Sequence, residues 1–142
     1  MSKYGKHIAL IGYSGHAYVA IDILLSASQT VTAYCDAEEK DHNPFSLTYL
    51  GKESDTDVQA ILKKYDYFIA IGDNAARSRL HKNLLPLLGN PINAIHATAV
   101  ISSSVKLKDG IFAAANVTVN PLVQIGSGVI CNTSCSIDHE CI

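Results

Sequence analysis

The sequence lacks a surplus of basic residues and has no long apolar run near its N-terminus. Eleven lysines and arginines stand against 13 acidic residues, a formal net charge of -2, so no excess of cations is available to displace counterions from nucleic acid phosphates. The apolar run at residues 8–11 is soon interrupted by glycines and a histidine, which makes it too short for a secretory signal or a membrane span. We therefore expect no nucleic acid partner, no membrane span and a cytoplasmic location.

The sequence has few cysteines, and they do not follow a metal-binding pattern. No C-x-x-C pair is present, and no histidine lies at a spacing typical of zinc ligands; the four cysteines are Cys35, Cys131, Cys135 and Cys141. We expect no metal, and free, mostly buried thiols in a reducing cytoplasm.

Residues 1–94 alternate strand-like and helix-like segments. Short apolar runs predict strands at residues 7–12, 31–35, 67–72 and 92–95. Helical spacing predicts helices that start near residues 17, 55 and 73, the last ending before Gly89. Strands that are apolar on both faces and alternate with helices predict a parallel sheet covered by helices, a small Rossmann-like α/β domain over residues 1–94. Residues 37–54 show little periodicity and are expected to form a surface excursion.

Residues 95–142 follow a period of six. Two tracks of small or aliphatic residues recur at this spacing: Ala99, Val105, Ile111, Val117, Val123, Val129, Cys135 and Cys141, and Ile101, Leu107, Ala113, Val119, Ile125, Cys131 and Ile137. A six-residue period indicates one short strand and one corner per repeat, stacked as a parallel β-helix with these side chains inside. The cysteines of both tracks are therefore interpreted as core residues rather than nucleophiles.

Candidate ligand-binding residues follow three of the predicted strands. The turn that contains Ser14, Gly15 and His16 joins a strand to a helix N-terminus, a place where backbone amides favour a phosphate. Its G-x-x-G spacing does not match the dinucleotide fingerprint, and a tight connection alone would also explain the glycines. Asp36 ends the second strand, where a carboxylate can accept from a ribose or remain solvated. Gly72 and Asp73 end the third, where Asp73 can also cap the next helix.

His139 and Glu140 are the candidate catalytic residues of the second half. They interrupt an uncharged stretch and fall in a corner of the predicted coil, from which a side chain can project towards a neighbouring subunit. A solvated surface pair is the alternative interpretation. His7, His42, His81 and His96 have no such context and are interpreted as structural or exposed.

Four blocks taken together resemble a known family. They are the strand–G-x-S-G-H–helix turn, Y-D-Y-F-I-A-I-G-D-N, H-A-T-A-V-I-S-S-S-V and N-T-S-C-S-I-D-H-E-C. In this order they are similar to the sialic acid O-acetyltransferase (NeuD) family, and most of all to the UDP-amino-sugar N-acetyltransferases of the bacillosamine type. The resemblance implies an N-terminal domain that binds a UDP-amino sugar and a left-handed β-helix. It also implies acetyl-CoA as co-substrate and a cytoplasmic homotrimer with active sites between subunits.

The resemblance also implies roles for single residues. The substrate loop would comprise Ser14, Gly15 and His16, and further substrate contacts would come from Asp36, Gly72 and Asp73. His139 would be the general base that deprotonates the attacking sugar amine or hydroxyl, Glu140 would stabilise its protonated form, and Asn132 would support the site. Asp73 replaces an asparagine of relatives, which leaves the contact at that point open. The thioester requires no covalent intermediate, so no catalytic cysteine is expected.

The family continues for several coils beyond the H-E-C block, and those coils hold the acetyl-CoA pocket. Because this sequence stops at Ile142 within a repeat, we expect it to be a fragment that binds nucleotide-sugar and transfers acetyl poorly or not at all. Free-thiol release from acetyl-CoA by this chain at a robust rate would contradict that. The alternatives are a sugar O-acetyltransferase, a non-catalytic nucleotide-sugar-binding or trimerisation module, and an NAD-binding domain. The sequence leaves open which sugar is used and whether nitrogen or oxygen is acetylated.

Overall fold

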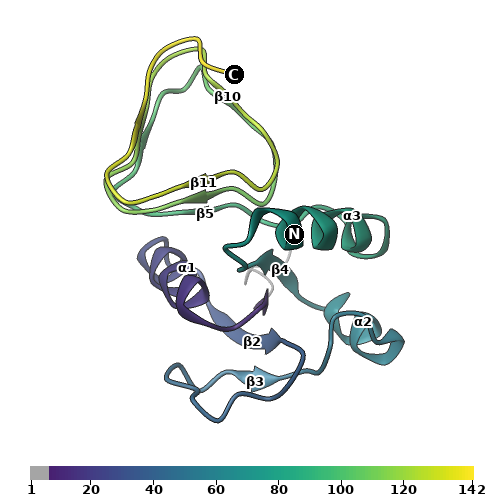
Figure 1. The fold of residues 1–142 in the computed structure, drawn as a ribbon. Helices are drawn as coiled ribbons and strands as arrows, with labels where there is room; N and C mark the ends of the chain where they lie inside the picture. Colours follow the sequence, from purple (N-terminus) through teal and green to yellow (C-terminus); the bar gives the residue numbers. More distant parts are fainter. Residues whose placement is uncertain (1–6) are drawn as a thin grey trace.

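The computed structural model describes residues 7–142, which form a layered α/β part beneath a triangular coil (Figure 1). The α/β part contains a four-stranded sheet in the order β3-β2-β1-β4. Its strands are β1 (Ile8–Ile11), β2 (Val31–Cys35), β3 (Thr48–Tyr49) and β4 (Asp66–Ile69), and all neighbours are parallel. The helices are α1 (Gly15–Ser26), α2 (Thr56–Leu62) and α3 (Asn74–Leu88).

Both faces of this sheet are buried, as the apolar strands predict. Ile8 and Leu10 of β1 pack with α1 in one core, whereas Ala9 and Ile11 pack with α2 and α3 in a second core. Side chains that alternate along a strand point to opposite faces, so a strand covered on both sides must be apolar throughout. The predicted parallel sheet with helices on both faces is confirmed.

One predicted strand of this sheet is wrong. Residues 92–95 are not a strand of this sheet. Ile92 donates one backbone hydrogen bond to the carbonyl of Tyr67 (2.9 Å), and the residues that follow pair with β8 (Phe112–Ala113) instead. The fourth strand is β3, which lies inside residues 37–54, the segment expected to be a surface excursion. A two-residue strand is too short to show a period, which explains why the sequence did not reveal it.

The coil is a parallel β-helix with three sheets. Its strands are β5 (Ala94–Ile95), β6 (Val100–Ile101), β7 (Lys106–Leu107), β8 (Phe112–Ala113), β9 (Thr118–Val119), β10 (Gln124–Ile125), β11 (Ile130–Cys131) and β12 (Ser136–Ile137). The three faces are β11-β8-β5, β12-β9-β6 and β10-β7. Ala94 pairs with Phe112 and Phe112 with Ile130, so three six-residue repeats complete one coil.

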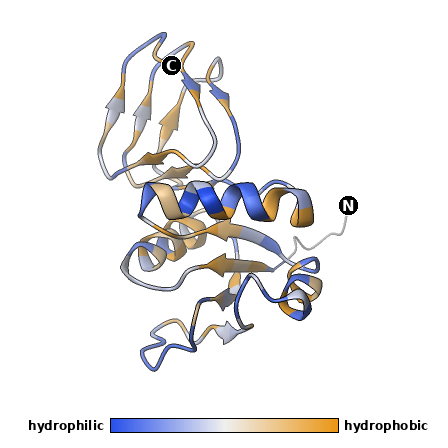
Figure 2. Cartoon of the chain, turned by 45° about the vertical axis from the view of Figure 1, so that its right-hand side comes forward, coloured by the Kyte–Doolittle hydropathy of each residue, from blue (hydrophilic) through white to orange (hydrophobic). Residues whose placement is uncertain are grey.

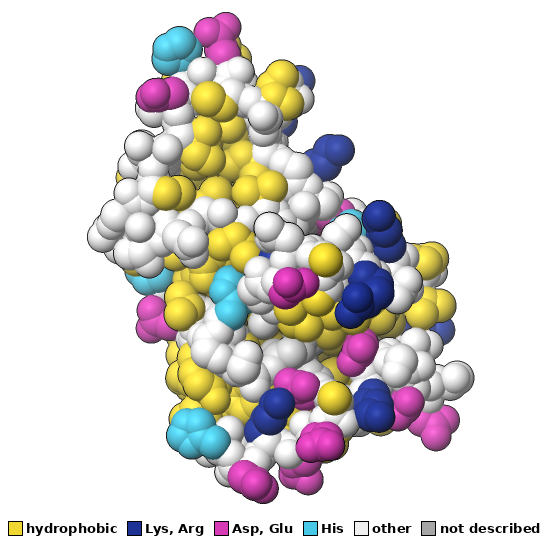
Figure 3. Space-filling model, viewed as in Figure 1, with side chains coloured by type: hydrophobic (Ala, Val, Ile, Leu, Met, Phe, Trp, Pro, Cys, Tyr) yellow, Lys and Arg dark blue, Asp and Glu magenta, His cyan; other side chains and the backbone are white. Residues whose placement is uncertain are grey.

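The two predicted tracks line the interior of this coil. One core cluster and the partly buried residues packed against it contain members of both tracks from Ala99 to Ile137. Figure 3 shows apolar side chains gathered in the middle of the triangular end of the coil. Two track members depart from the prediction: Val129 is 37% exposed, and Cys141 is exposed, with no strand among residues 7–142 stacked over it. The burial of Cys131 is confirmed, and Cys135 is half-buried.

The corners of the coil repeat one backbone feature. A residue with positive φ occurs every sixth position, at Gly110, Asn116, Leu122, Gly128, Ser134 and Glu140. The left-handed conformation lets the chain turn sharply between faces, and it costs about 1–2 kcal/mol for a residue with a Cβ. Four of these six positions are not glycine, so stacking of the coils holds them in place.

The β11-β8-β5 face packs on the α/β part. Its outward residues Ala94 and Phe112 belong to the same core as α1, so both residues of each strand on this face are buried or half-buried. The strands of this face are orange in Figure 2, whereas most strands of the other two faces are paler or blue. Ser26 accepts a hydrogen bond from the amide of Ala97 (3.0 Å) across the junction. Among residues 7–142, no helix is long and apolar enough to cross a membrane.

Candidate functional site

Three loops follow the carboxyl ends of β1, β2 and β4 and meet at one edge of the sheet. The first turns at Gly12, which has φ +94° and donates a hydrogen bond to the carbonyl of Cys35 at 2.8 Å. Ser14 and Gly15 are exposed, and the Ser14 hydroxyl does not cap α1. The amides that begin α1 are therefore free of a side-chain acceptor, an arrangement that suits a phosphate.

Asp36, at the end of β2, fixes the first loop. Its carboxylate accepts hydrogen bonds from the amides of Tyr13 (3.0 Å) and Ala37 (2.7 Å) and forms an ion pair with Lys40 at 3.3 Å. This carboxylate is therefore not the freely solvated group that the sequence left as an alternative. A contact between Asp36 and a ligand stays a prediction.

The third loop is organised by the residues that follow it. Asp73 caps α3, because its carboxylate accepts a hydrogen bond from the amide of Ala76 at 2.7 Å. The carbonyls of Ile71 and Gly72 each accept from the guanidinium of Arg77 at 3.0 Å. The capping role that the sequence gave Asp73 as one option is confirmed, while its contact with a substrate stays a prediction.

His16 lies where the first loop meets the coil. Its ring stacks on Phe112 of β8 with centroids 4.4 Å apart, and a Cβ at Gly72 would lie 3.8 Å from it. Burial lowers the pKa of His16, and the positive charge of Arg77 lowers it further. Its Nε2 atom is buried and has no hydrogen-bond partner among the described residues. The ring is therefore neutral at pH 7 and offers one unused polar atom at the junction.

A cavity of about 340 Å³ lies at the same edge of the sheet. Gly12 and Asp36 line it, together with Lys52, Arg79 and Asn83. Neither Lys52 nor Arg79 forms an ion pair with a carboxylate among residues 7–142. Sequence reasoning missed these side chains, since no motif or period marks them. The cavity places two cations beside a glycine turn and beside the carboxylates of Asp36 and Glu53, and the cations can donate to an anionic group such as a diphosphate.

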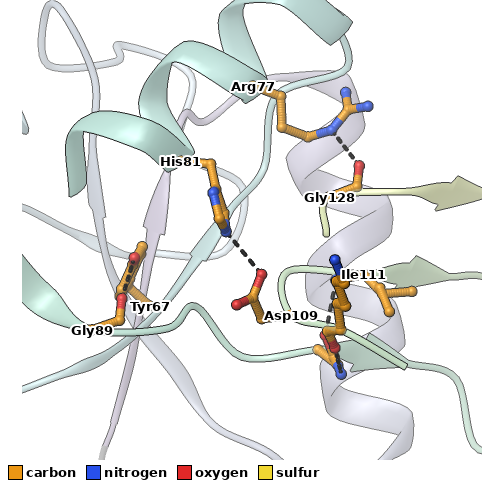
Figure 4. A network of polar contacts seen from close by, with 9 residues as sticks. Tyr67, Arg77, His81, Gly89, Asp109, Ile111 and Gly128 are labelled. Carbon is orange, nitrogen blue, oxygen red and sulfur yellow. Dashed lines mark hydrogen bonds and ion pairs between the residues drawn. The ribbon is translucent and has the colours of Figure 1, made fainter. Parts of the chain in front are cut away.

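A second cavity, of about 470 Å³, lies between α3 and a corner of the coil. Arg77, His81 and Lys82 line it from the helix, and Gly128 lines it from the coil. His81 Nε2 lies 2.8 Å from the carboxylate of Asp109, which hydrogen bonds hold at a lowered pKa despite partial burial (Figure 4). These contacts fasten the helix to the coil. They confirm the structural interpretation of His81.

His139 and Glu140 lie in the last corner of the coil. Their side chains are 74% and 69% exposed, and His139 Nδ1 lies 3.1 Å from a carboxylate oxygen of Glu140. Glu140 has φ +60°, and its amide donates to the carbonyl of Pro121 in the corner below. The predicted pair is therefore formed, and the turn that carries it is held by the stacked coil.

The structure separates this pair from the other predicted residues. The corner at His139 joins the β12-β9-β6 face to the β10-β7 face, so it lies opposite the β11-β8-β5 face that packs on the α/β part (Figure 1). Asn132 precedes β12, so a whole face of the prism separates it from His139. One chain thus brings together Gly72 and His16 near the crevice but leaves His139 and Glu140 at the far apex.

Two of the four thiols, those of Cys35 and Cys131, are buried and unreactive. Burial raises the pKa of Cys35 to about 12, and burial together with Cys135 raises that of Cys131 to about 11. Both are therefore protonated at neutral pH and are poor nucleophiles. Within residues 7–142, no group of three or more His, Cys, Asp or Glu side chains is placed to hold a metal ion.

Residues 7–84 match the family profile of the PglD N-terminal domain. Among curated proteins, the chain is 26% identical over 107 residues to UDP-N-acetylbacillosamine N-acetyltransferase of Bacillus subtilis (strain 168). That alignment covers 74% of this chain and 50% of the relative. The chain thus spans half the length of that curated relative.

Solved structures share the fold of nearly all of this chain. A histidine-to-alanine variant of GDP-perosamine N-acetyltransferase from Caulobacter crescentus, in complex with CoA and GDP-perosamine, is 32% identical with a TM-score of 0.85. The match covers 94% of this chain and 63% of that one. The acetyltransferase domain of PglB from Neisseria gonorrhoeae FA1090 has a TM-score of 0.82 at 22% identity, covering 96% and 66% of the two chains, and shows the fold alone. The expected fold class, a Rossmann-like α/β domain followed by the start of a left-handed parallel β-helix, is confirmed.

Proposed function

Because the chain belongs to the family of the PglD N-terminal domain, we propose that it is part of an acetyl-CoA-dependent N-acetyltransferase for a nucleotide-linked amino sugar. The reaction would serve bacterial glycan synthesis in the cytoplasm. The relatives named for UDP-N-acetylbacillosamine and GDP-perosamine support this substrate class. The resemblance seen in the sequence to the bacillosamine-type enzymes is confirmed by these matches, and the link to the sialic acid enzymes stays a prediction.

The observation that carries the proposal is the crevice at the carboxyl edge of the sheet. In parallel α/β sheets, ligands bind outside the carboxyl ends of the strands. Here Gly12 lines the crevice, and Lys52 and Arg79 bring two cations that form no ion pair among residues 7–142. A nucleoside diphosphate meets both requirements, because its phosphates take amide and cationic donors. Ser14 and Gly15, whose neighbouring amides begin α1, would extend the same contact.

His139 is proposed as the general base. A neutral imidazole accepts the proton that the sugar amine loses as it attacks the acetyl-CoA thioester, and the thioester sulfur leaves as the CoA thiol. Glu140, 3.1 Å away, stabilises the imidazolium that results. Solved structures of the Caulobacter crescentus relative include histidine-to-alanine and histidine-to-asparagine variants with CoA and GDP-perosamine bound. That a histidine was replaced in that relative supports the choice of a histidine as the base here.

The proposed reaction requires a second copy of the chain. The crevice and His139 lie on opposite sides of one coil, so a sugar held in the crevice does not reach the histidine of its own chain. A homotrimer whose β-helices stand side by side would place the crevice of one copy against the His139 corner of the next. Asn132, on a different edge of the prism from His139, could then support the site from a neighbouring copy.

The first test compares ligands for the chain itself. We expect UDP-linked or GDP-linked amino sugars to bind in calorimetric titrations, and NAD to bind far more weakly because the loop lacks the dinucleotide fingerprint. A ligand present at 100 times its Kd stabilises the folded state by about 2.7 kcal/mol, so the same ligand should also raise Tm.

Charge removal in the crevice provides the control. Arg79→Gln should weaken binding of the nucleotide sugar, whereas Lys82→Gln, a neighbouring exposed cation outside this crevice, should not. A sugar nucleotide O-acetyltransferase would pass this test and differ only in its acceptor atom. Failure of every nucleotide sugar to bind would favour a purely structural module.

A further inference from the structure

Arg77 has no assigned role in the proposed reaction, yet burial of its charged side chain costs free energy. Among residues 7–142 it is the one charged side chain classed as buried, with 9% of its surface exposed. Burial lowers the pKa of its guanidinium, and no carboxylate lies within ion-pair distance of it in that range. A buried cation is retained only where hydrogen bonds replace its hydration. Its partners therefore indicate what it does.

Three of these partners lie in the loop after β4 or at the first residue of α3. Guanidinium Nη1 donates to the carbonyls of Ile71 and Gly72 at 3.0 Å each, and Nη2 donates to the side-chain oxygen of Asn74 at 2.7 Å. The backbone amide of Arg77 also donates to the carbonyl of Asp73 at 3.0 Å. Three successive carbonyl groups thus turn towards one residue.

This arrangement also fixes the direction of the amide N–H groups on the opposite side of the loop. In a trans peptide the C=O and N–H groups point in opposite directions. When the carbonyls of Ile71, Gly72 and Asp73 face Arg77, the amides of Gly72, Asp73 and Asn74 point away from it. None of these three amides forms a hydrogen bond to an acceptor among residues 7–142. The loop therefore presents a row of free donors directly after Ile71, which lines the crevice.

The fourth partner lies on the coil. Guanidinium Nε donates to the carbonyl of Gly128 at 2.7 Å, across 51 residues of sequence (Figure 4). Gly128 is a corner residue with φ +69°, and its own amide donates to the carbonyl of Asp109 in the corner below. The same side chain that orients the loop therefore also sets its position relative to the β-helix.

We propose that Arg77 is a positioning residue for the nucleotide-sugar site. It orients the amides of Gly72 and Asp73 as donors for the ligand and locks their loop to the Gly128 corner of the coil. This inference rests on the proposed function of the crevice. A planar guanidinium with five donors can hold four separate acceptors at once, which an ammonium group cannot.

The test uses the chain as it is, with UDP and GDP as probes. In wild type, addition of the better-binding nucleotide should shift the amide resonances of Gly72 and Asp73 in ¹H–¹⁵N spectra. Arg77→Met should raise the calorimetric Kd about tenfold or more, the loss expected when several hydrogen bonds to a charged group disappear, and should abolish these shifts. Arg77→Lys, which keeps the charge and part of the donors, should fall between the two.

His81→Gln is the matched control. It removes the other polar link between α3 and this corner, the contact with Asp109, without touching the loop. It should leave Kd and both amide shifts unchanged, even if Tm falls. The proposal is overturned if Arg77→Lys binds as tightly as wild type with unchanged amide shifts, or if His81→Gln weakens binding as much as Arg77→Met. Absence of nucleotide binding in wild type would instead contradict the proposed function.

Discussion

Replacing His139 with alanine should slow acetyl transfer by about 10²–10⁴-fold, the usual contribution of a positioned general base. The measurement is CoA-thiol release in a fusion of this chain to the part of the Caulobacter crescentus enzyme that lies beyond the match. Affinity for the nucleotide sugar should stay unchanged, because His139 lies at the apex of the coil away from the crevice. Glu140→Gln should cause a smaller loss, because it removes only the charge that stabilises the imidazolium.

His42→Ala is the control for this substitution. His42 is an exposed histidine of the α/β part, so its loss should leave the rate unchanged. Equal rates of acetyl transfer for His139→Ala and wild type would show that this corner of the coil has no catalytic role. The surface interpretation of the pair would then stand.

Replacing Gly12 with alanine should lower the free energy of unfolding by about 2–6 kcal/mol, the sum expected for a strained backbone and an overpacked site. Gly12 has φ +94°, and an added Cβ would lie 2.6 Å from Cγ1 of Ile71 and 3.3 Å from the carbonyl of Ala70. The loop after β1 and the loop after β4 would have to separate. Urea unfolding of the chain measures this change.

Gly15→Ala serves as the matched control. Gly15 lies at the start of α1 with normal φ, and an added Cβ meets no heavy atom within 4 Å. Alanine there should leave stability unchanged or raise it by up to about 1 kcal/mol, because glycine is a poor helix residue. Similar losses of stability for Gly12→Ala and Gly15→Ala would contradict this account, because they would show that the close contact with Ile71 is not the reason for glycine at position 12.

Features with a long repeat were predictable from the sequence, and features built from two residues were not. The six-residue tracks identified the inner wall of the coil from Ala99 to Ile137 because each repeat adds the same evidence. β3 escaped prediction, and β5 was assigned to the wrong sheet, since a two-residue strand is defined by its partner rather than by its own pattern. Cys141 was expected inside and is exposed, because burial at an inner position depends on the coil above it.

Candidate site residues could be proposed from the sequence only where they lie in loops directly after predicted strands. Ser14, Gly15 and Gly72 stand at strand ends, so their loops could be assigned from the sequence alone. Arg77 and Arg79 lie within an ordinary amphipathic helix, and their roles depend on a loop and a coil corner that the sequence does not place beside them. Asp36 was expected to face a ligand or solvent, and its bond to the Tyr13 amide became visible only with the fold.

Mixing two inactive variants tests most directly whether the crevice of one copy serves His139 of another. One variant carries His139→Ala, and the other carries Lys52→Glu and Arg79→Glu, and both are fused to the part of the Caulobacter crescentus enzyme that lies beyond the match. If sites form between copies of a trimer, random co-assembly of equal amounts should restore about a quarter of wild-type acetyl transfer, because a quarter of the sites pair an intact crevice with an intact histidine. Mixed oligomers as inactive as either variant alone would contradict the account.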